Sequence, residues 1–178
     1  APAPYTTSTL QQEASRRMRF TARRTMALAQ QLYEGISIDN EETVGLITYM
    51  RTDSTNVSPL AQQEAREYVR KVHGEKFLPQ APPKHKTSDK GAQEAHEAIR
   101  PTSVNRTPKL MKEFLTRDQY RLYQMIWQRF VASQMEAAVY DTLRVTVTGK
   151  SEAHEYRLQA SGSAVKFMGF MAVYEETK

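Results

Sequence analysis

The stretch "LITYMRTDSTNVS", residues 46–58, joins an apolar run to a polar one. Its first half belongs to "VGLITYM", whose β-branched and apolar residues predict a strand over residues 44–51. Because alternate side chains of a strand share a face, Tyr49 and Arg51 should point the same way. A plain strand exit needs one turn residue, whereas here hydroxyl groups and an aspartate follow. The arrangement therefore indicates a functional site at the end of the strand.

Tyr49 and Arg51 have the chemistry of a nucleophile that acts on a phosphodiester. Phenolate is scarce at neutral pH, so a tyrosine nucleophile needs activation by its surroundings. A guanidinium beside it stabilises the anion and can also hold a phosphate through two hydrogen bonds. The competing interpretation is structural: a core tyrosine with an arginine packed over it, and Asp53 or Ser54 as a cap. Spacing alone favours the structural interpretation.

A second group of polar residues lies in "AHEAIRPT", residues 95–102. On a short helix predicted for residues 92–100, His96 and Arg100 are one turn apart, which places a proton donor or phosphate ligand beside a permanent cation. The alternatives are a surface ion pair between Glu97 and Arg100 and a hydrogen-bonded structural histidine. A zinc site fails here, because the chain has no cysteine and the second histidine of an H-E-x-x-H pattern is absent.

The composition fits one full domain and part of a second: 178 residues, of which 39% are hydrophobic and 25% charged. The net charge is +5, and "RRMRFTARR", residues 16–24, concentrates arginines. Such a patch can bind phosphate backbones, with Arg23 and Arg24 as candidate DNA contacts, although a solvated helix face explains it equally well. No apolar run is as long as a membrane span, and no secretion signal opens the chain. We therefore expect a cytoplasmic protein without membrane contact.

The periodicity predicts a mainly α-helical domain over residues 1–138, with the short strand inside it. Its helices are expected over residues 6–18, 22–34, 60–72, 92–100, 107–115 and 116–135. The first two resemble a helix-turn-helix. Over residues 139–178 the period changes to two, which predicts three strands of a partial antiparallel sheet, with turns at 149–151 and 161–163.

Capping residues and the spacing of apolar residues predict where the helices begin and end and which faces they bury. Thr9 with Gln12 predicts a capping box for the first helix, and Thr21 predicts the N-cap of the second helix, which should end at Gly35. Ser58 before Pro59 predicts the start of the third helix. The predicted inner stripe of the second helix is Ala22, Met26, Ala29 and Tyr33. The predicted inner face of the last helix is Leu122, Ile126, Phe130 and Ser133.

Three stretches of the sequence, taken together, identify a protein family more specifically than any of these patterns does. "YTTSTLQQEASRRMRFTARRTMALAQQLYEG", "LITYMRTDSTNVS" and "AQEAHEAIRPT", in this order and spacing, closely resemble the type IA DNA topoisomerases, and the bacterial enzymes in particular. The resemblance covers nearly the whole chain. It implies the central architecture of that family: a mobile helical domain that bears the tyrosine, followed by returning strands of an arch-like domain.

The resemblance also implies roles for single residues. Tyr49 matches the nucleophile that attacks single-stranded DNA and forms a 5′-phosphotyrosyl link, which leaves a free 3′-hydroxyl. Arg51 matches the arginine that contacts DNA and holds the scissile phosphate. His96 matches a histidine that assists phosphate positioning or proton transfer. Supporting roles are implied for Thr48, Glu97 and Arg100, of which Thr48 and Arg100 would contact DNA.

The chain departs from the family by lacking the acidic metal-binding domain, a further strand-binding domain and the C-terminal zinc modules. The resemblance therefore implies a fragment, in which magnesium would be a cofactor of the intact enzyme, with its ligands outside this chain. Its partners would be single-stranded DNA and the remaining domains of the same enzyme. Two alternatives stay open: a non-catalytic helix-turn-helix module in which Tyr49 is structural, and the equivalent part of a decatenating topoisomerase or reverse gyrase.

Overall fold

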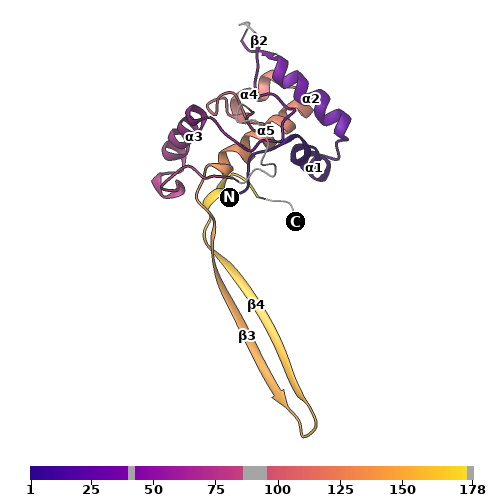
Figure 1. Ribbon diagram of the computed structural model, residues 1–178, viewed down its shortest axis with the longest axis vertical. Coiled ribbons are helices and arrows are strands. Elements are labelled where there is room, and N and C mark those ends of the chain that lie inside the picture. Colours follow the sequence, from indigo (N-terminus) through magenta and orange to yellow (C-terminus); the bar gives the residue numbers. More distant parts are fainter. Residues whose placement is uncertain (40–42, 86–95, 176–178) are drawn as a thin grey trace.

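A computed structural model describes residues 1–39, 43–85 and 96–175 of the chain. The helices gather into a compact head, and a long two-stranded hairpin projects from it (Figure 1). The helices are α1 (Thr7–Met18), α2 (Ala22–Glu34), α3 (Pro59–Val72), α4 (Pro108–Met111) and α5 (Arg117–Ser133). Short 3-10 turns are η1 (Glu75–Phe77), η2 (Lys112–Phe114) and η3 (Gly169–Ala172).

Hydroxyl side chains cap these helices, as the sequence predicts for Thr21 and for Ser58 before Pro59. Gly35 ends α2 at a φ of 127°, a conformation that glycine adopts without strain. The capping box of α1 is wrong by one turn. Thr6 is the N-cap and exchanges hydrogen bonds with Thr9, because the helix begins earlier than the predicted box requires.

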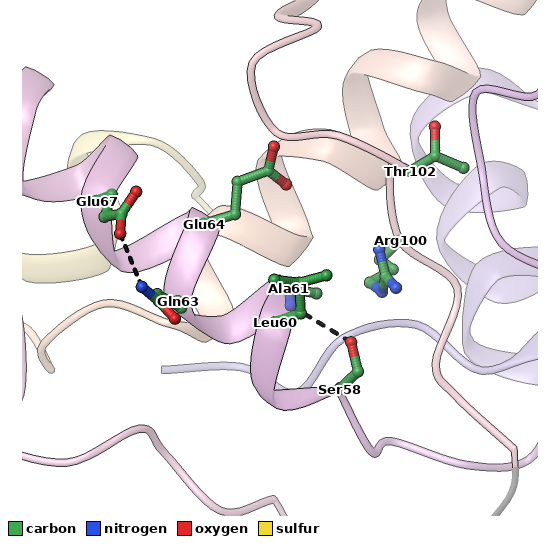
Figure 2. A pocket seen from close by; sticks show the side chains of 8 residues that line it. All are labelled: Ser58, Leu60, Ala61, Gln63, Glu64, Glu67, Arg100 and Thr102. Carbon is green, nitrogen blue, oxygen red and sulfur yellow. Dashed lines mark hydrogen bonds between the residues drawn. The ribbon is translucent and has the colours of Figure 1, made fainter.

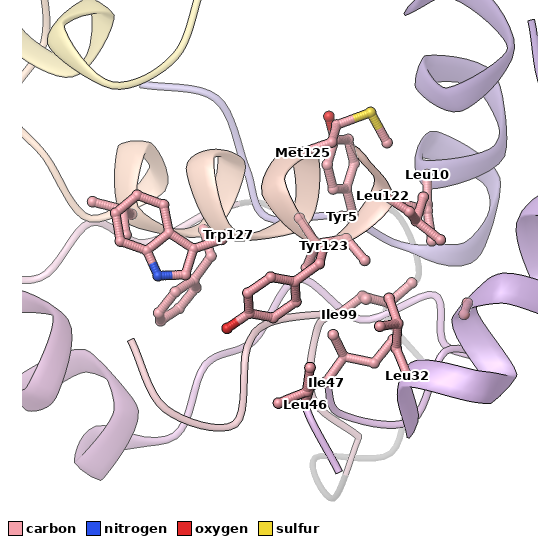
Figure 3. Close-up of a cluster of buried hydrophobic side chains, with 14 of the residues drawn as sticks. Tyr5, Leu10, Leu32, Leu46, Ile47, Ile99, Leu122, Tyr123, Met125 and Trp127 are labelled. Atoms are coloured by element: carbon pink, nitrogen blue, oxygen red, sulfur yellow. The ribbon is translucent and has the colours of Figure 1, made fainter. Parts of the chain in front are cut away.

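Helix α5 contributes Leu122, Tyr123, Met125 and Trp127 to the cluster of buried hydrophobic side chains (Figure 3). Its predicted inner face is confirmed: Leu122, Ile126, Phe130 and Ser133 are at most 1% exposed. The stripe predicted for α2 is half right: Ala29 is buried and Met26 is half-buried, whereas Ala22 and Tyr33 face solvent. The buried face consists of the residues at i, i+3, i+4 and i+7, which are Thr25, Leu28, Ala29 and Leu32.

The strand predicted over residues 44–51 is wrong in length. Only Thr43–Val44 (β2) pairs in a ladder, with Ile36–Ser37 (β1). The chain then stays extended, but the backbone N–H of Leu46 donates to the Leu32 carbonyl oxygen in α2, at 2.8 Å. Because the residues of this segment bond to several distant parts of the chain, no continuous ladder forms.

The helix predicted up to Arg100 is also wrong where the structure describes it. Residues 96–100 are extended, and the backbone N–H of Ile99 donates to the Tyr5 carbonyl oxygen at 2.9 Å. Pro101 disfavours a helical conformation at the residue before it, which contributes to this outcome. Residues 92–95 of the predicted helix lie outside the described residues.

The three predicted C-terminal strands are two longer ones: β3 (Val139–Lys150) and β4 (Glu155–Phe167) form one antiparallel hairpin. The predicted turn at residues 161–163 is wrong, because Gly162 pairs with Leu143 in the middle of the ladder. The turn lies between the two strands, near residues 151–154. The hairpin confirms an antiparallel segment after the helices, but with fewer strands than predicted.

The chain returns from the hairpin to the head. The Phe170 backbone N–H donates to the Glu136 carbonyl oxygen at 2.9 Å, and Tyr174 is only 2% exposed. The hydroxyl of Tyr174 meets that of Tyr5 at 3.2 Å and accepts from Arg129 at 2.9 Å. The division into two domains at residue 138 stays a prediction.

Candidate active site

Thr48 fixes the backbone just before Tyr49. Its hydroxyl donates to the Ala98 carbonyl oxygen at 2.7 Å and accepts from the backbone N–H of Arg100 at 3.0 Å. The backbone N–H of Thr48 also donates to the Arg100 carbonyl oxygen, at 2.9 Å. The sequence names Thr48 as a DNA contact, and this stays a prediction. In the structure, Thr48 joins the backbone before Tyr49 to the backbone of residues 98–100.

Thr7, the first residue of α1, fixes the chain just after Tyr49. Its hydroxyl donates to the Met50 carbonyl oxygen at 2.7 Å and accepts from the Thr52 backbone N–H at 2.8 Å. The backbone N–H of Thr7 donates to the Thr52 carbonyl oxygen at 2.9 Å. The backbone around Tyr49 is therefore held from both sides by hydrogen bonds to distant segments.

The side chains alternate along this extended segment. Tyr49 is 49% exposed and Arg51 is exposed, whereas Met50 between them is 1% exposed. Within residues 1–39, 43–85 and 96–175, neither the Tyr49 hydroxyl nor the Arg51 guanidinium has a hydrogen-bond or ion-pair partner. Both groups are thus available to a ligand, and the core-tyrosine interpretation does not fit the exposure of Tyr49.

The hydroxyl-rich residues that follow form a loop without regular secondary structure, held by side-chain hydrogen bonds. Ser54 is fully buried, and its hydroxyl accepts from the Asn56 backbone N–H at 3.1 Å. Its own backbone N–H donates to the Thr52 hydroxyl at 3.1 Å. Ser58 then caps α3 by accepting from the Ala61 backbone N–H at 3.3 Å. These hydroxyls bond to nearby backbone groups, which is how side chains of this type stabilise turns.

His96 is exposed and lines a cleft of about 600 Å³ beside the N-terminus of α3. Lys84, His85, Glu97 and Gln134 line the same cleft. Burial lowers the pKa of His85 from its ordinary value, although its contact with the Ser133 carbonyl oxygen opposes the shift. Tyr49 and Arg51 do not line this cleft.

Arg100 is committed to contacts within the protein. Its side chain is 13% exposed, pairs with Glu97 at 2.6 Å and donates to the Pro101 carbonyl oxygen at 3.1 Å. It lines a second cleft of about 380 Å³. Thr102 lies on the same side of this cleft as Arg100, and Glu64 of α3 lies on the opposite side (Figure 2). The predicted ion pair is present, but on extended backbone. Arg100 is less available to DNA than the exposed Arg51, Arg23 and Arg24.

The two candidates in the basic patch differ. Arg23 is exposed on α2, and the part of the chain that the structure describes offers it no ion pair. Arg24 pairs with Asp118 of α5 and lies over the Phe20 ring, with its guanidinium carbon 5.3 Å from the ring centroid. Arg24 therefore ties two helices together, whereas Arg23 remains open to an anionic ligand.

Sequence reasoning missed two residues next to Tyr49. One is Thr7, whose hydrogen bonds cross 43 to 45 sequence positions. The other is Tyr33, whose ring meets that of Tyr49 edge-on, with centroids 5.4 Å apart and planes at 64°. Reading the buried face of α2 one position earlier along the helix would have placed Tyr33 on the exposed side.

The described residues include no group of three or more His, Asp or Glu that could hold a metal ion. Across the same described residues, no helix is long and apolar enough to cross a membrane.

The chain belongs to the DNA topoisomerase family, whose pattern it matches over residues 1–178. Its sequence and fold together align it with the type IA bacterial enzymes. The full-length topoisomerase I of Thermotoga maritima is similar in structure, with 39% identity and a TM-score of 0.84. The match covers 99% of this chain and 27% of that one, so the chain spans about a quarter of its relative's length. The predicted family and fold class are thus confirmed.

Proposed function

We propose that this chain is the tyrosine-bearing part of an enzyme that transiently cleaves single-stranded DNA. The Tyr49 hydroxyl gives up its proton, and its oxygen bonds to the phosphorus of a phosphodiester as the bond from phosphorus to the 3′-oxygen breaks. The 3′-oxygen takes up a proton and becomes the free 3′-hydroxyl. The strand end keeps its bond energy as a 5′-phosphotyrosyl ester, so the reverse step reseals the strand without ATP. The observation that carries the proposal is the exposed Tyr49, held on backbone that is fixed on both sides.

Arg51 is the residue we propose for the scissile phosphate. It is exposed, stands two positions from Tyr49 on an extended segment, and its guanidinium can make two parallel hydrogen bonds to phosphate oxygens. We assign His96 a supporting role in phosphate positioning or proton transfer. Its cleft next to the N-terminus of α3 suits an anion, because backbone N–H groups at a helix start carry partial positive charge.

In the intact enzyme the net result would be relaxation of negatively supercoiled DNA. The proposal places the enzyme in the cytoplasm and gives it magnesium, with ligands in the parts that lie beyond this chain. The magnesium would supply charge stabilisation near the scissile phosphate. Thr48, Arg100, Arg23 and Arg24 are proposed as further DNA contacts, and the exposure of Arg23 makes it the strongest of them.

Two assays on the isolated chain test this reading. We expect weak binding to a single-stranded oligonucleotide, with an affinity that falls as salt rises by about 0.7 log units per tenfold salt for each phosphate neutralised. We expect no relaxation of negatively supercoiled plasmid, because this chain is about a quarter of its relative's length. Relaxation by the isolated chain would overturn the claim that the remaining parts are needed.

A helix-turn-helix DNA-binding module is the second candidate, because α1 and α2 are consecutive and pack against each other. That function predicts sequence-dependent duplex binding that Tyr49→Phe does not alter. Competition between duplex and single-stranded oligonucleotides of matched length separates the two functions. Relaxation and decatenation assays on the intact enzyme distinguish a relaxing enzyme from a decatenating relative.

A further inference from the structure

Tyr33 is the aromatic neighbour of Tyr49. It lies in the last turn of α2, is 41% exposed, and its ring meets the Tyr49 ring edge-on at a centroid distance of 5.4 Å. We propose that Tyr33 is a positioning residue that holds the phenol ring of Tyr49 in its reactive orientation. The inference rests on the nucleophile role proposed above for Tyr49.

The backbone of Tyr33 is fixed to the segment that leads to Tyr49. The Leu46 backbone N–H donates to the Leu32 carbonyl oxygen at 2.8 Å. Gly45 lies so close to α2 that a Cβ atom there would be 2.8 Å from the Tyr33 carbonyl oxygen. The end of α2 that carries Tyr33 is therefore in direct contact with the chain three to four residues before Tyr49.

Tyr49 needs such a contact because its backbone is fixed while its side chain stands in solvent. Rotation about its two side-chain torsions would move the hydroxyl by several ångströms. Among the described residues, Tyr33 supplies the ring contact to Tyr49, and the Tyr49 hydroxyl has no hydrogen-bond partner. An edge-to-face pair restricts the ring without touching the hydroxyl. The Tyr49 hydroxyl thus stays free to react, while the ring can adopt fewer orientations. Holding a reacting group in the productive orientation speeds a reaction.

This role requires the ring of Tyr33 and not its hydroxyl, which makes it separable from proton transfer. The test uses the intact enzyme with Tyr33→Phe and Tyr33→Leu. Leucine is chosen because it favours helix formation at least as well as tyrosine, so α2 itself is not weakened. Ala27→Leu is the matched control, because Ala27 is an exposed position on the same helix.

Two quantities are measured on a 3′-labelled single-stranded oligonucleotide with magnesium. The first is the rate of covalent complex formation at saturating enzyme, and the second is the dissociation constant, determined in a Tyr49→Phe background that binds without cleaving. We expect Tyr33→Leu to slow covalent complex formation about two- to tenfold, with the dissociation constant unchanged. Tyr33→Phe and Ala27→Leu should react at the wild-type rate.

Three results would overturn the inference. A Tyr33→Leu enzyme that cleaves at the wild-type rate removes the positioning role. A weaker dissociation constant with an unchanged rate assigns Tyr33 to base stacking instead. Loss of rate in Tyr33→Phe assigns the role to the hydroxyl. The proposed function fails separately, if Tyr49→Phe still forms the covalent complex.

Discussion

Thr7 is joined to Thr52 by three hydrogen bonds, one of which runs from the Thr7 hydroxyl to the Thr52 carbonyl oxygen at 3.1 Å. The Thr7 backbone N–H donates to the Thr52 carbonyl oxygen at 2.9 Å, and the Thr52 N–H donates to the Thr7 hydroxyl at 2.8 Å. This pair joins the start of α1 to the chain three residues beyond Tyr49. The orientation of the candidate nucleophile therefore depends on a helix that begins more than 40 residues away.

Thr7→Val should destabilise the protein, because valine has nearly the same shape but leaves the Met50 carbonyl and the Thr52 N–H without their hydroxyl partner. The expected loss in the free energy of unfolding is about 1–3 kcal/mol. Urea denaturation measures it. Thr7→Ser keeps the hydroxyl and should recover most of the loss; equal losses in both variants would contradict the hydrogen-bond explanation.

Tyr174→Phe should weaken the contact between the C-terminal segment after the hairpin and the helical head, and so destabilise the protein. The Tyr174 hydroxyl accepts from Arg129 and lies 3.2 Å from both Glu13 and Tyr5, in a buried cluster. Its removal leaves these groups with fewer partners, at about 1–3 kcal/mol of unfolding free energy. Denaturant unfolding is again the measurement, with Tyr156→Phe as the control, since Tyr156 is 60% exposed. A similar loss in the control would refute the assignment.

The stability of the chain should fall in alkaline solution. Burial raises the pKa of Tyr5 well above its ordinary value, and the hydrogen bond with Tyr174 raises it further. An unfolded tyrosine ionises near pH 10, so above about pH 10 the unfolded state gives up a proton that the folded state keeps. The contribution of Tyr5 to the free energy of unfolding is therefore fully present below pH 10 and is lost as the pH rises above it.

Unfolding free energies between pH 8 and 11 measure this loss. The unfolding free energy of Tyr5→Phe should fall less steeply with pH than that of the wild type. The two slopes should differ by up to about 1.4 kcal/mol per pH unit. Parallel curves for the two proteins would show that Tyr5 does not titrate differently on unfolding.

The hairpin should be the least protected regular structure in the isolated chain. Leu143, Val145, Val147 and Leu158 share one of its faces and are 45–70% exposed. A two-stranded hairpin with no packed face is marginal in water. Amide hydrogen exchange should therefore be much faster in β3 and β4 than in α5. Equal protection in both regions would contradict this expectation.

Local signals made much of the helical head predictable. Thr21, Ser58 and Gly35 mark helix ends through interactions within one turn, and the face of α5 follows from its period. The extended segments around residues 46–52 and 96–100 escaped prediction because their hydrogen bonds go to partners far along the chain. No local pattern records such partners.

The candidate site divides in the same way. Tyr49 and Arg51 could be named as candidates because the motif around them resembles that of a known family, and their exposure beside the buried Met50 fits the alternation of an extended segment. Thr7 and Tyr33 could not, since their contacts with this segment exist only once the helices have packed. Gly162 misled the prediction for a related reason: a serine-flanked glycine looks like a turn, yet it pairs within a straight ladder.

The most direct test of the account is to identify the residue that becomes attached to DNA. The covalent complex of the intact enzyme is trapped by denaturation and digested with a protease that cuts after glutamate. Glu34, Glu41 and Glu42 lie between Tyr33 and Tyr49, so the two tyrosines fall in different peptides. We predict a nucleotide remnant, joined through its 5′-phosphate, on the peptide that carries Tyr49. A remnant on any other residue, or a trapped complex from Tyr49→Phe, would contradict the account.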